Sequence, residues 1–362
     1  MSRLLLTAGG TGGHMFPAQA LAENLKCQGW NIAMMTDARG RKYADRIPAD
    51  PIIEVEAASM TPRRPIQAVA GAIKLGRGIK TAKVFIKDWN PHIVVGFGGY
   101  PVFPPMRVAQ VRGLPTIIHE QNAVLGRVNR LFAGKAKVVA SGFADLEKCP
   151  EGVNHVVTGN PLRARIIEAA PDTYTAPKDT INLFIVGGSL GARLMSETVP
   201  EAVALLPEDM RERLHVVQQT REDSLDRARQ TYADVGVFAL CEPFFSDVET
   251  HLAKAHYVIG RAGASSVSEI ALMGKPSQLV PLATAMDDHQ TENAKVLKRL
   301  GAADITPESE FTPDRVKTIL MKRLNDSNWL ERAALAARTA ARPDAASQLA
   351  EQVSRTVRLN PG

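Results

Sequence analysis

The stretch LLLTAGGTGGH, residues 4–14, is an apolar run followed at once by a glycine-rich turn, and LFIVGGSLG, residues 183–191, repeats the arrangement in the second half of the chain. A short apolar run that ends in glycines is typical of a buried strand leading into a helix. Glycines let the backbone approach an anion closely, and the N-terminus of the following helix offers unpaired N–H groups and a partial positive charge. The repeated turn therefore predicts two nucleotide-binding-like halves that face a shared cleft.

Strand and helix patterns alternate along the rest of the chain, which is typical of parallel sheets with crossover helices on both faces. We predict an α/β protein, and the length of 362 residues favours two domains over a single core. Strands are expected at residues 3–8, 31–36, 52–55, 92–96, 116–119, 137–141 and 155–158 in the first half, and at 181–186, 214–218, 236–240, 257–260, 278–280 and 303–305 in the second.

The boundary between the halves is expected between GNP at residues 159–161 and the segment 171–178, where prolines and polar residues interrupt the periodicity. Beyond Phe311 the pattern is helical to the end. Such a tail commonly packs across a domain boundary.

The composition, 45% hydrophobic and 23% charged, is that of a soluble globular protein. No apolar run reaches the roughly 20 residues that span a bilayer. Cys27, Cys149 and Cys241 lie far apart and form no metal-binding spacing, which disfavours a zinc site or a disulfide framework. We expect a cytoplasmic protein in a reducing compartment.

A basic stretch interrupts the first half and contains no acid. Its charged residues are Arg63, Arg64, Lys74, Arg77, Lys80, Lys83 and Lys87. On a helical wheel, one side is the usual core-facing stripe, formed by Leu75, Ile79, Ala82 and Ile86. The opposite side mixes apolar and basic residues, namely Ile66, Val69, Ile73 and Val84 with Arg77, Lys80 and Lys87.

Two explanations of this mixed side remain open. Basic residues beside exposed apolar ones suit shallow docking on an anionic membrane, and scattered surface aliphatics are also common in soluble proteins. Ile73, Lys74, Arg77 and Lys80 are the candidate membrane residues. Nucleic acid is disfavoured because aromatic residues are scarce in the stretch.

The first glycine turn does not match the dinucleotide fingerprint GxGxxG. Counting from Gly10, the last position is Met15, so a nicotinamide enzyme is disfavoured despite Asp37 at the end of the second strand. His14 closes the turn at the mouth of an anion-binding loop. A lone histidine is usually structural, but this position makes His14 a candidate for acid or base catalysis.

Further polar and glycine-rich segments follow other strands of the first half. GFGGYP at 96–101 is a third glycine turn, and HEQN at 119–122 follows another apolar strand. Open α/β sheets bind ligands at the carboxyl ends of their strands. Although a tight turn and a helix cap explain part of the pattern, two glycine turns in one half favour an acceptor that carries its own diphosphate.

In the second half, RAGASSVSE at 261–269 joins a strand to a helix. Its hydroxyls could serve as helix caps only, whereas Glu269 is also placed to accept hydrogen bonds from a ribose diol. DDHQ at 287–290 could suit a divalent cation. We favour a helix start, because acids there complement the helix dipole and no metal is required.

Seven motifs, in order along nearly the whole chain, resemble those of the MurG family, the bacterial UDP-N-acetylglucosamine:N-acetylmuramyl-(pentapeptide) pyrophosphoryl-undecaprenol N-acetylglucosamine transferases. They are GGTGGH (9–14), GFGGYP (96–101), HEQNAVLGRVNR (119–130), GNPLR (159–163), GGSLGAR (187–193), RAGASSVSE (261–269) and DDHQTENA (287–294). The resemblance implies a GT-B fold of two Rossmann-like domains with a deep cleft. It implies residues 1–163 plus about 341–358 as the acceptor and membrane-facing domain, and 164–340 as the UDP-GlcNAc-binding domain.

The implied reaction transfers GlcNAc from UDP-GlcNAc to the 4-hydroxyl of MurNAc in undecaprenyl-diphosphate-MurNAc-pentapeptide, with inversion, formation of a β-1,4 link and release of UDP. The partners would be these two substrates and an anionic membrane surface, at the cytoplasmic face of the bacterial inner membrane as a peripheral protein. No cofactor and no metal are implied. A UDP-sugar 2-epimerase of the same architecture and a non-catalytic nucleotide-sugar binding protein are the alternatives.

The resemblance also implies a set of site residues. Those expected to bind the donor are Thr11, Gly12, Gly13, Asn122, Arg163, Ser189, Phe245, Ala264, Ser265, Glu269 and Gln290, and those expected to bind the acceptor are Gly10, Gly98, Gly99 and Tyr100. We expect Arg163 and Ser189 at the diphosphate, the Phe245 backbone at the uracil and Glu269 at the ribose. His14 is the expected base, and Glu120 is either the reserve base or a residue that orients His14.

Some positions depart from the family pattern. Leu190 stands where the family usually has glutamine, and Val102-Phe103 replaces a common Ser-Gly. The first change would remove a polar contact with the donor, and the second would alter the acceptor side. Neither affects the glycines, so we expect activity to be retained.

Overall fold

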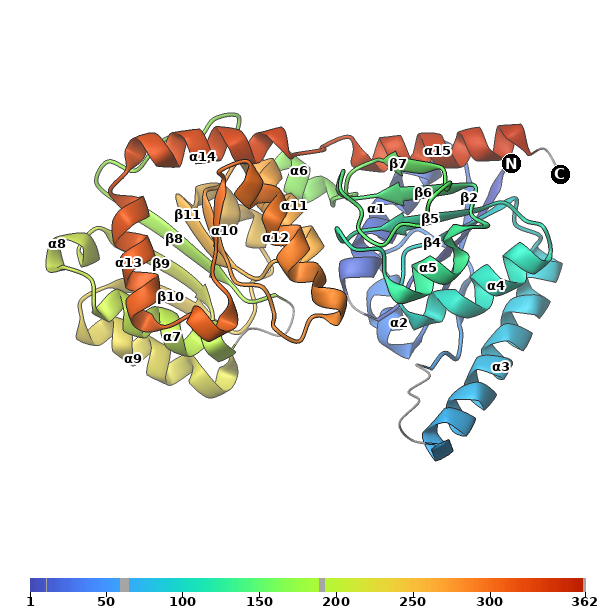
Figure 1. The fold of residues 1–362 in the computed structure, drawn as a ribbon, viewed down its shortest axis with the longest axis horizontal. Helices are drawn as coiled ribbons and strands as arrows, with labels where there is room; N and C mark the ends of the chain where they lie inside the picture. The colour runs from blue at the N-terminus through green and yellow to red at the C-terminus, as the bar shows by residue number, and fades with distance from the viewer. Residues whose placement is uncertain (11, 59–64, 189–192, 361–362) are drawn as a thin grey trace. The chain divides into compact units, whose positions relative to one another are not determined.

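The computed structural model describes residues 1–10, 12–58, 65–188 and 193–360, with side chains from residue 69 onward in the helix that begins at Pro65 (Figure 1). The chain divides into two compact units. Unit 1 comprises Met1–Arg163 and the C-terminal segment from Arg342, and unit 2 comprises Ala164–Ala341.

Unit 1 contains a parallel seven-stranded sheet in the order β3-β2-β1-β4-β5-β6-β7. The strands are β1 (Arg3–Thr7), β2 (Asn31–Thr36), β3 (Ile52–Glu54), β4 (Ile93–Gly96), β5 (Thr116–Glu120), β6 (Val138–Ser141) and β7 (His155–Val157). The order reverses direction between β1 and β4, which is the point where doubly wound sheets bind ligands at the carboxyl ends of their strands.

Helices cover both faces of this sheet, and β1 shows why. Leu4 and Leu6 point to one face and Leu5 to the other, because side chains alternate along a strand. The first face packs on α1 (Gly12–Cys27) and α15 (Ala345–Leu359), and α2 (Ala38–Ala44) follows β2. The second packs on α3 (Pro65–Trp89), η1 (Tyr100–Val102), α4 (Phe103–Val111) and α5 (Arg127–Ala133).

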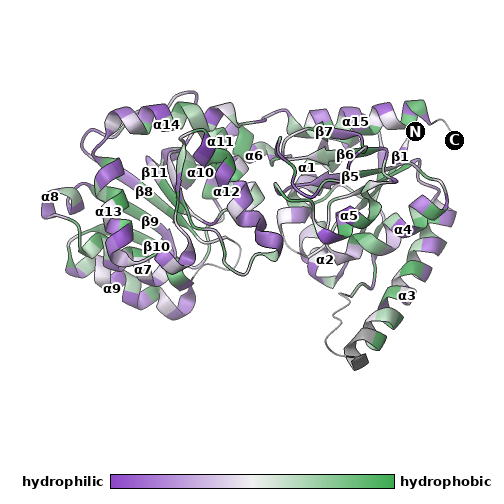
Figure 2. Cartoon of the chain, viewed as in Figure 1, coloured by the Kyte–Doolittle hydropathy of each residue, from purple (hydrophilic) through white to green (hydrophobic). Residues whose placement is uncertain are grey.

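Unit 2 contains a parallel six-stranded sheet in the order β10-β9-β8-β11-β12-β13. The strands are β8 (Ile181–Val186), β9 (Leu214–Gln219), β10 (Phe238–Glu242), β11 (Tyr257–Gly260), β12 (Ser277–Leu279) and β13 (Ala303–Ile305). Its helices are α6 (Ala164–Glu168), α7 (Arg193–Ala204), α8 (Glu208–Arg211), η2 (Glu222–Ser224), α9 (Leu225–Asp234), α10 (Val248–Lys254), α11 (Ala264–Met273), η3 (Met286–Asp288), α12 (His289–Arg299), η4 (Glu308–Glu310), α13 (Pro313–Leu324) and α14 (Ser327–Thr339). Figure 2 shows the hydrophobic strands inside each unit.

The α/β prediction is confirmed, and each expected strand is found with its ends within two residues of the expected ones. The largest shift is in β10, expected from Gly236 and found from Phe238. Gly236 has φ +70° and its N–H donates to the Ala233 carbonyl. It therefore closes the turn after α9 and cannot extend the strand.

The predicted faces of α3 are confirmed in part. Leu75 and Ile79, expected on the core side, are only half-buried. Ala82 and Ile86 are fully buried, whereas Val69, Ile73 and Val84 are 62%, 53% and 54% exposed. Ile66 lies outside the described side chains. Over the described residues, no helix combines the length and apolar character that crossing a membrane requires.

Candidate active site

Two glycine turns meet at the carboxyl ends of β1 and β4. A side chain on Gly9 would lie 2.2 Å from Cγ of Pro101, and one on Gly99 would lie 3.0 Å from the Gly9 carbonyl oxygen. Gly99 has φ +84° and directly precedes Tyr100, the half-buried first residue of η1. The expected acceptor residues therefore lie together, because only glycine allows the two turns this close approach.

His14 lies on the first turn of α1 and faces the second of these turns. Its Nδ1 is 3.0 Å from the Gly9 carbonyl oxygen, which only accepts, so Nδ1 carries the proton and Nε2 the lone pair of the neutral ring. Gly98 has φ +95°, and a Cβ there would lie 3.2 Å from Nε2. The missing side chain at position 98 therefore leaves room for the ring nitrogen suited to accept a proton.

Asp37, at the end of β2, organises the first glycine turn. Its carboxylate accepts hydrogen bonds from the Gly10 N–H at 3.2 Å, the Gly40 N–H at 2.9 Å and Arg39 Nε at 3.1 Å. Burial acts to raise the pKa of Asp37, but these donors outweigh it and hold the pKa below its usual value. Because the Gly10 N–H already donates to Asp37, it is not available to a ligand. The part that Gly10 plays in the turn is its positive φ of +87°.

Glu120 ends β5 and holds the following loop. Its Oε1 accepts from the Asn122 N–H at 3.1 Å and the Asn122 side-chain amide at 3.0 Å. Its Oε2 accepts from the Gly126 N–H at 2.9 Å and Asn129 Nδ2 at 2.8 Å. Glu120 is 98% buried, and both of its carboxylate oxygens accept hydrogen bonds from this loop and from Asn129.

Asn129, on α5, is a residue to which the sequence assigned no role. It is 2% exposed, its Nδ2 would lie 3.5 Å from a Cβ on Gly98, and its Oδ1 has no hydrogen-bond partner among the described residues. Asn129 thus connects Glu120 to the glycine turn beside His14. The only sequence signal was the second asparagine of the HEQNAVLGRVNR motif.

His119 fastens the turn that leads to Arg163. Its Nε2–H donates to the Gly159 carbonyl at 3.0 Å, and its Nδ1 accepts from Gln121 Nε2 at 3.1 Å. Complete burial lowers the pKa of His119 to about 4, against a smaller opposing effect of the Gly159 hydrogen bond. His119 is therefore neutral at physiological pH and has a structural part in the HEQN segment.

Arg163 is carried by that turn to the start of α1. Its guanidinium lies 4.5 Å above the Phe16 ring, and the Phe16 ring in turn abuts Gly12, where a Cβ would lie 2.7 Å from Cε2. Gly13, exposed, is the next residue of the helix. The expected donor residues Gly12, Gly13, Asn122 and Arg163 are thus all part of unit 1. Thr11 lies outside the described residues, as does Ser189 in the second half.

The second glycine turn, in unit 2, is tied to the Phe245 loop by a residue that sequence reasoning missed. Gln219 Oε1 accepts from the Gly187 N–H at 3.2 Å, and its Nε2 donates to the Pro243 carbonyl at 3.2 Å. Phe245 is 7% exposed and packs edge-on against His251, with ring centroids 4.8 Å apart. The only available sequence signal was a glutamine directly after an expected strand.

The other expected donor residues of unit 2 follow β11 and β12. Ala264 and Ser265 begin α11 directly after Gly263, and Glu269 lies on the same helix, half-buried. Gln290, in the first turn of α12, accepts the Leu282 N–H on Oε1 at 3.0 Å. The expected donor residues therefore divide between the two units.

The DDHQ segment is a helix start, as predicted. Asp287 and Asp288 have φ of 55° and 54° and immediately precede α12. Asp288 Oδ1 accepts the Thr291 hydroxyl at 2.7 Å. Across the described part of the chain, His, Cys, Asp and Glu side chains form no group of three or more that could hold a metal ion.

Comparison with known proteins agrees over both units. Residues 4–141 match the glycosyltransferase family 28 N-terminal domain, and residues 182–349 match the C-terminal domain of that family. The UDP-N-acetylglucosamine–N-acetylmuramyl-(pentapeptide) pyrophosphoryl-undecaprenol N-acetylglucosamine transferase of Maricaulis maris (strain MCS10) is 49% identical over 355 residues, which cover 97% of this chain and 96% of the relative.

Two solved structures are informative. The crystal structure of MurG from Acinetobacter baumannii has a TM-score of 0.82 and 30% identity, covering 98% of this chain and 100% of that one. A UDP-GlcNAc 2-epimerase from Neisseria meningitidis, bound to UDP-GlcNAc, has a TM-score of 0.66 at 13% identity, covering 98% and 100%, and shares the fold alone. With two parallel Rossmann-like sheets, the chain has the GT-B fold and belongs to the MurG family of glycosyltransferases.

Proposed function

We propose that the protein transfers GlcNAc from UDP-GlcNAc to the 4-hydroxyl of MurNAc in undecaprenyl-diphosphate-MurNAc-pentapeptide, with inversion to a β-1,4 link. The names of its relatives support the substrates. The observation that carries the chemistry is the geometry of His14. Its Nδ1 is hydrogen-bonded to the Gly9 carbonyl, and its Nε2 lies beside Gly98, which has no side chain. A ring fixed in this tautomer is suited to general-base catalysis.

The proposed step is a single displacement. His14 Nε2 takes the proton of the acceptor hydroxyl, whose oxygen forms a bond to the anomeric carbon on the face opposite UDP. The bond between this carbon and the β-phosphate oxygen breaks, and UDP leaves with the electron pair. Attack from the opposite face inverts the anomeric centre. A single displacement requires one general base, which is His14.

Charge on the departing UDP needs stabilisation. Arg163 supplies a guanidinium, which recognises phosphate through a rigid fork of donors. Glu269 and the start of α11 would bind the ribose and phosphate side, and the Phe245 backbone the uracil. Gln290 would offer its Nε2 to a sugar hydroxyl, since its Oε1 already accepts the Leu282 N–H. No metal or cofactor is part of this proposal.

The acceptor is bound to a lipid, so the protein must reach a membrane. The exposed face of α3 combines Ile73 with the exposed Lys74, Arg77 and Lys80. Exposed apolar side chains among cations suit peripheral binding to an anionic leaflet. We therefore propose that the protein docks through α3 on the cytoplasmic face of the bacterial inner membrane.

Incubation of the purified protein with UDP-GlcNAc, with and without a polyprenyl-diphosphate-MurNAc-pentapeptide, tests the reaction. We expect UDP release only with the acceptor, and a product whose anomeric proton coupling in NMR is that of a β-glycoside. An isomerised UDP-sugar without acceptor would identify an epimerase. Binding of UDP-GlcNAc with neither product would identify a non-catalytic binding protein.

A further inference from the structure

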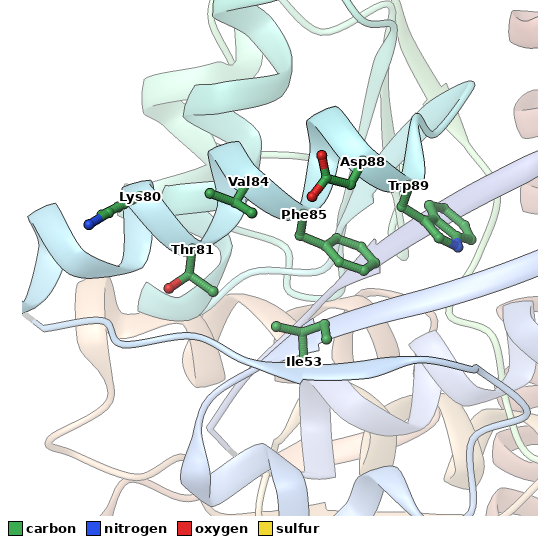
Figure 3. Close-up of a pocket in the computed structure, with 7 residues that line it drawn as sticks. All are labelled: Ile53, Lys80, Thr81, Val84, Phe85, Asp88 and Trp89. Carbon is green, nitrogen blue, oxygen red and sulfur yellow. The ribbon is translucent and has the colours of Figure 1, made fainter.

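A groove of about 600 Å³ lies between α3 and the edge strand β3 (Figure 3). Its volume is in the range of small-molecule pockets, roughly 300–1,000 Å³. It is lined by Ile53, Lys80, Thr81, Val84, Phe85, Asp88 and Trp89.

The floor of the groove is apolar and aromatic. The Phe85 and Trp89 rings are stacked, with centroids 5.7 Å apart and an interplanar angle of 16°. In Figure 3 they hang from α3 on the side of β3, where Ile53 points toward them. All three side chains are half-buried, so a ligand would remove further apolar surface from water.

The groove exists because β3 is the edge strand of the sheet, whereas α3 is anchored to the core by other residues. Among the described strands, β3 pairs with β2 alone. α3 is anchored by Ala82 and Ile86 in the core and by Gly78, where a Cβ would lie 2.0 Å from the Glu56 carbonyl oxygen. The α3 residues from Lys80 to Trp89 that line the groove therefore lie beside β3 without closing the space between helix and strand.

The groove is continuous with the face proposed to dock on the membrane. At 100° per residue, Lys80 and Val84 each lie within about 20° of Ile73 around the helix axis. Lys80 and Val84 are also lining residues of the groove. An acyl chain of a lipid at this face would therefore reach the groove beside Lys80 and Val84.

Charge orients the ligand. Residues 65–89 contain five lysine and arginine side chains and one acid, Asp88. Lys80 lies at one end of the groove, whereas Asp88 lies beside Trp89 at the other. Among the lining residues Lys80 is the cation and Asp88 the anion, so the charges of the lining favour a negatively charged headgroup at the Lys80 end.

We infer that this groove binds one acyl chain of an anionic phospholipid, with the headgroup phosphate at Lys80 and the chain running toward Phe85 and Trp89. The inference rests on the membrane docking proposed above. It adds a site for an individual lipid to what would otherwise be contact with a surface.

Binding of a monomeric lipid distinguishes a site in the groove from docking on a membrane surface. We would titrate the full-length protein with dihexanoyl-phosphatidylglycerol below its micelle concentration and follow tryptophan fluorescence, expecting saturable one-to-one binding whose signal is lost in Trp89→Phe. Thr81→Phe, which fills the groove, should weaken binding by roughly tenfold or more because burial of the chain is lost. Ala72→Phe adds the same ring to α3 outside the lining residues and should leave binding unchanged.

Vesicles carrying phosphatidylglycerol with brominated chains complete the test. Quenching should be stronger in the wild type than in Trp89→Phe, and Thr81→Phe should keep full transfer to a water-soluble acceptor, which shows that it folds. Vesicle binding without monomer binding or Trp89 quenching would overturn the groove and leave the docking proposal intact. No vesicle binding at all would overturn both. Preference for geranylgeranyl phosphate over phosphatidylglycerol, or dimerisation that Thr81→Phe abolishes, would also overturn the assignment.

Discussion

The tautomer of His14 depends on one backbone carbonyl. The Gly9 oxygen, 3.0 Å from Nδ1, keeps the proton on that nitrogen and leaves the other as the base. We predict that His14→Ala lowers kcat by roughly 10²–10⁴-fold, the usual contribution of a general base. UDP affinity, measured by calorimetry, should change little. An unchanged turnover rate would remove His14 from the mechanism.

Gly98 combines a left-handed backbone with a close approach to His14. Gly98→Ala should lower the free energy of unfolding by about 1–2 kcal/mol, because φ is +95°. It should also lower kcat, since its methyl group would lie 3.2 Å from Nε2. Gly113→Ala is the control, because Gly113 has φ +74° and a Cβ there would meet no described heavy atom within 4 Å. Equal kcat in the two variants, measured beside chemical denaturation, contradicts the prediction.

His119 makes stability depend on pH. Its pKa is about 4 in the folded protein and about 6.5 in an unfolded chain, so the unfolded state binds more protons between these values. Its contribution to stability is complete above pH 6.5 and is lost as the pH falls toward 4. The resulting decrease in the free energy of unfolding is on the order of 3 kcal/mol. His119→Gln should show a shallower decrease of the unfolding free energy over this window, by denaturant titration. Parallel pH profiles would show that His119 is not the titrating group.

At the level of single elements, α3 presents different residues to the core and to solvent. Ile73→Glu with Lys80→Glu should reduce co-sedimentation with anionic liposomes by roughly tenfold or more, since each cation near such a surface contributes about 1 kcal/mol. Leu335→Glu with Arg332→Glu makes the same change of charge on α14, where Leu335 is 70% exposed. Transfer to a water-soluble acceptor should be retained in both variants. Equal liposome binding of the two would leave α3 without a docking role.

At the level of the whole chain, α15 completes the core of unit 1 from the far end of the sequence. Leu349 is fully buried in the core that β1 and β4 share with α1. Leu349→Ala should therefore lower the free energy of unfolding by about 2–5 kcal/mol. Hydrogen exchange should then increase in β1 and β4 and remain slow in β8 and β11. Leu330→Ala, a fully buried leucine in the core of unit 2, should produce the reverse pattern. Uniform loss of protection in both variants would mean that the units unfold together.

Apolar runs and glycine turns were enough to predict both sheets, because burial in a parallel sheet and positive φ are local demands on residue type. They also indicated His14, Glu120 and the third glycine turn as neighbours at one sheet edge. The parts played by Asp37 and Gln219 required the fold, since their hydrogen bonds join segments far apart along the chain. The place of Asn129 beside the Gly98 turn required it for the same reason. So did the groove between β3 and α3. Such features arise from distances between folded segments, which no local pattern of residues encodes.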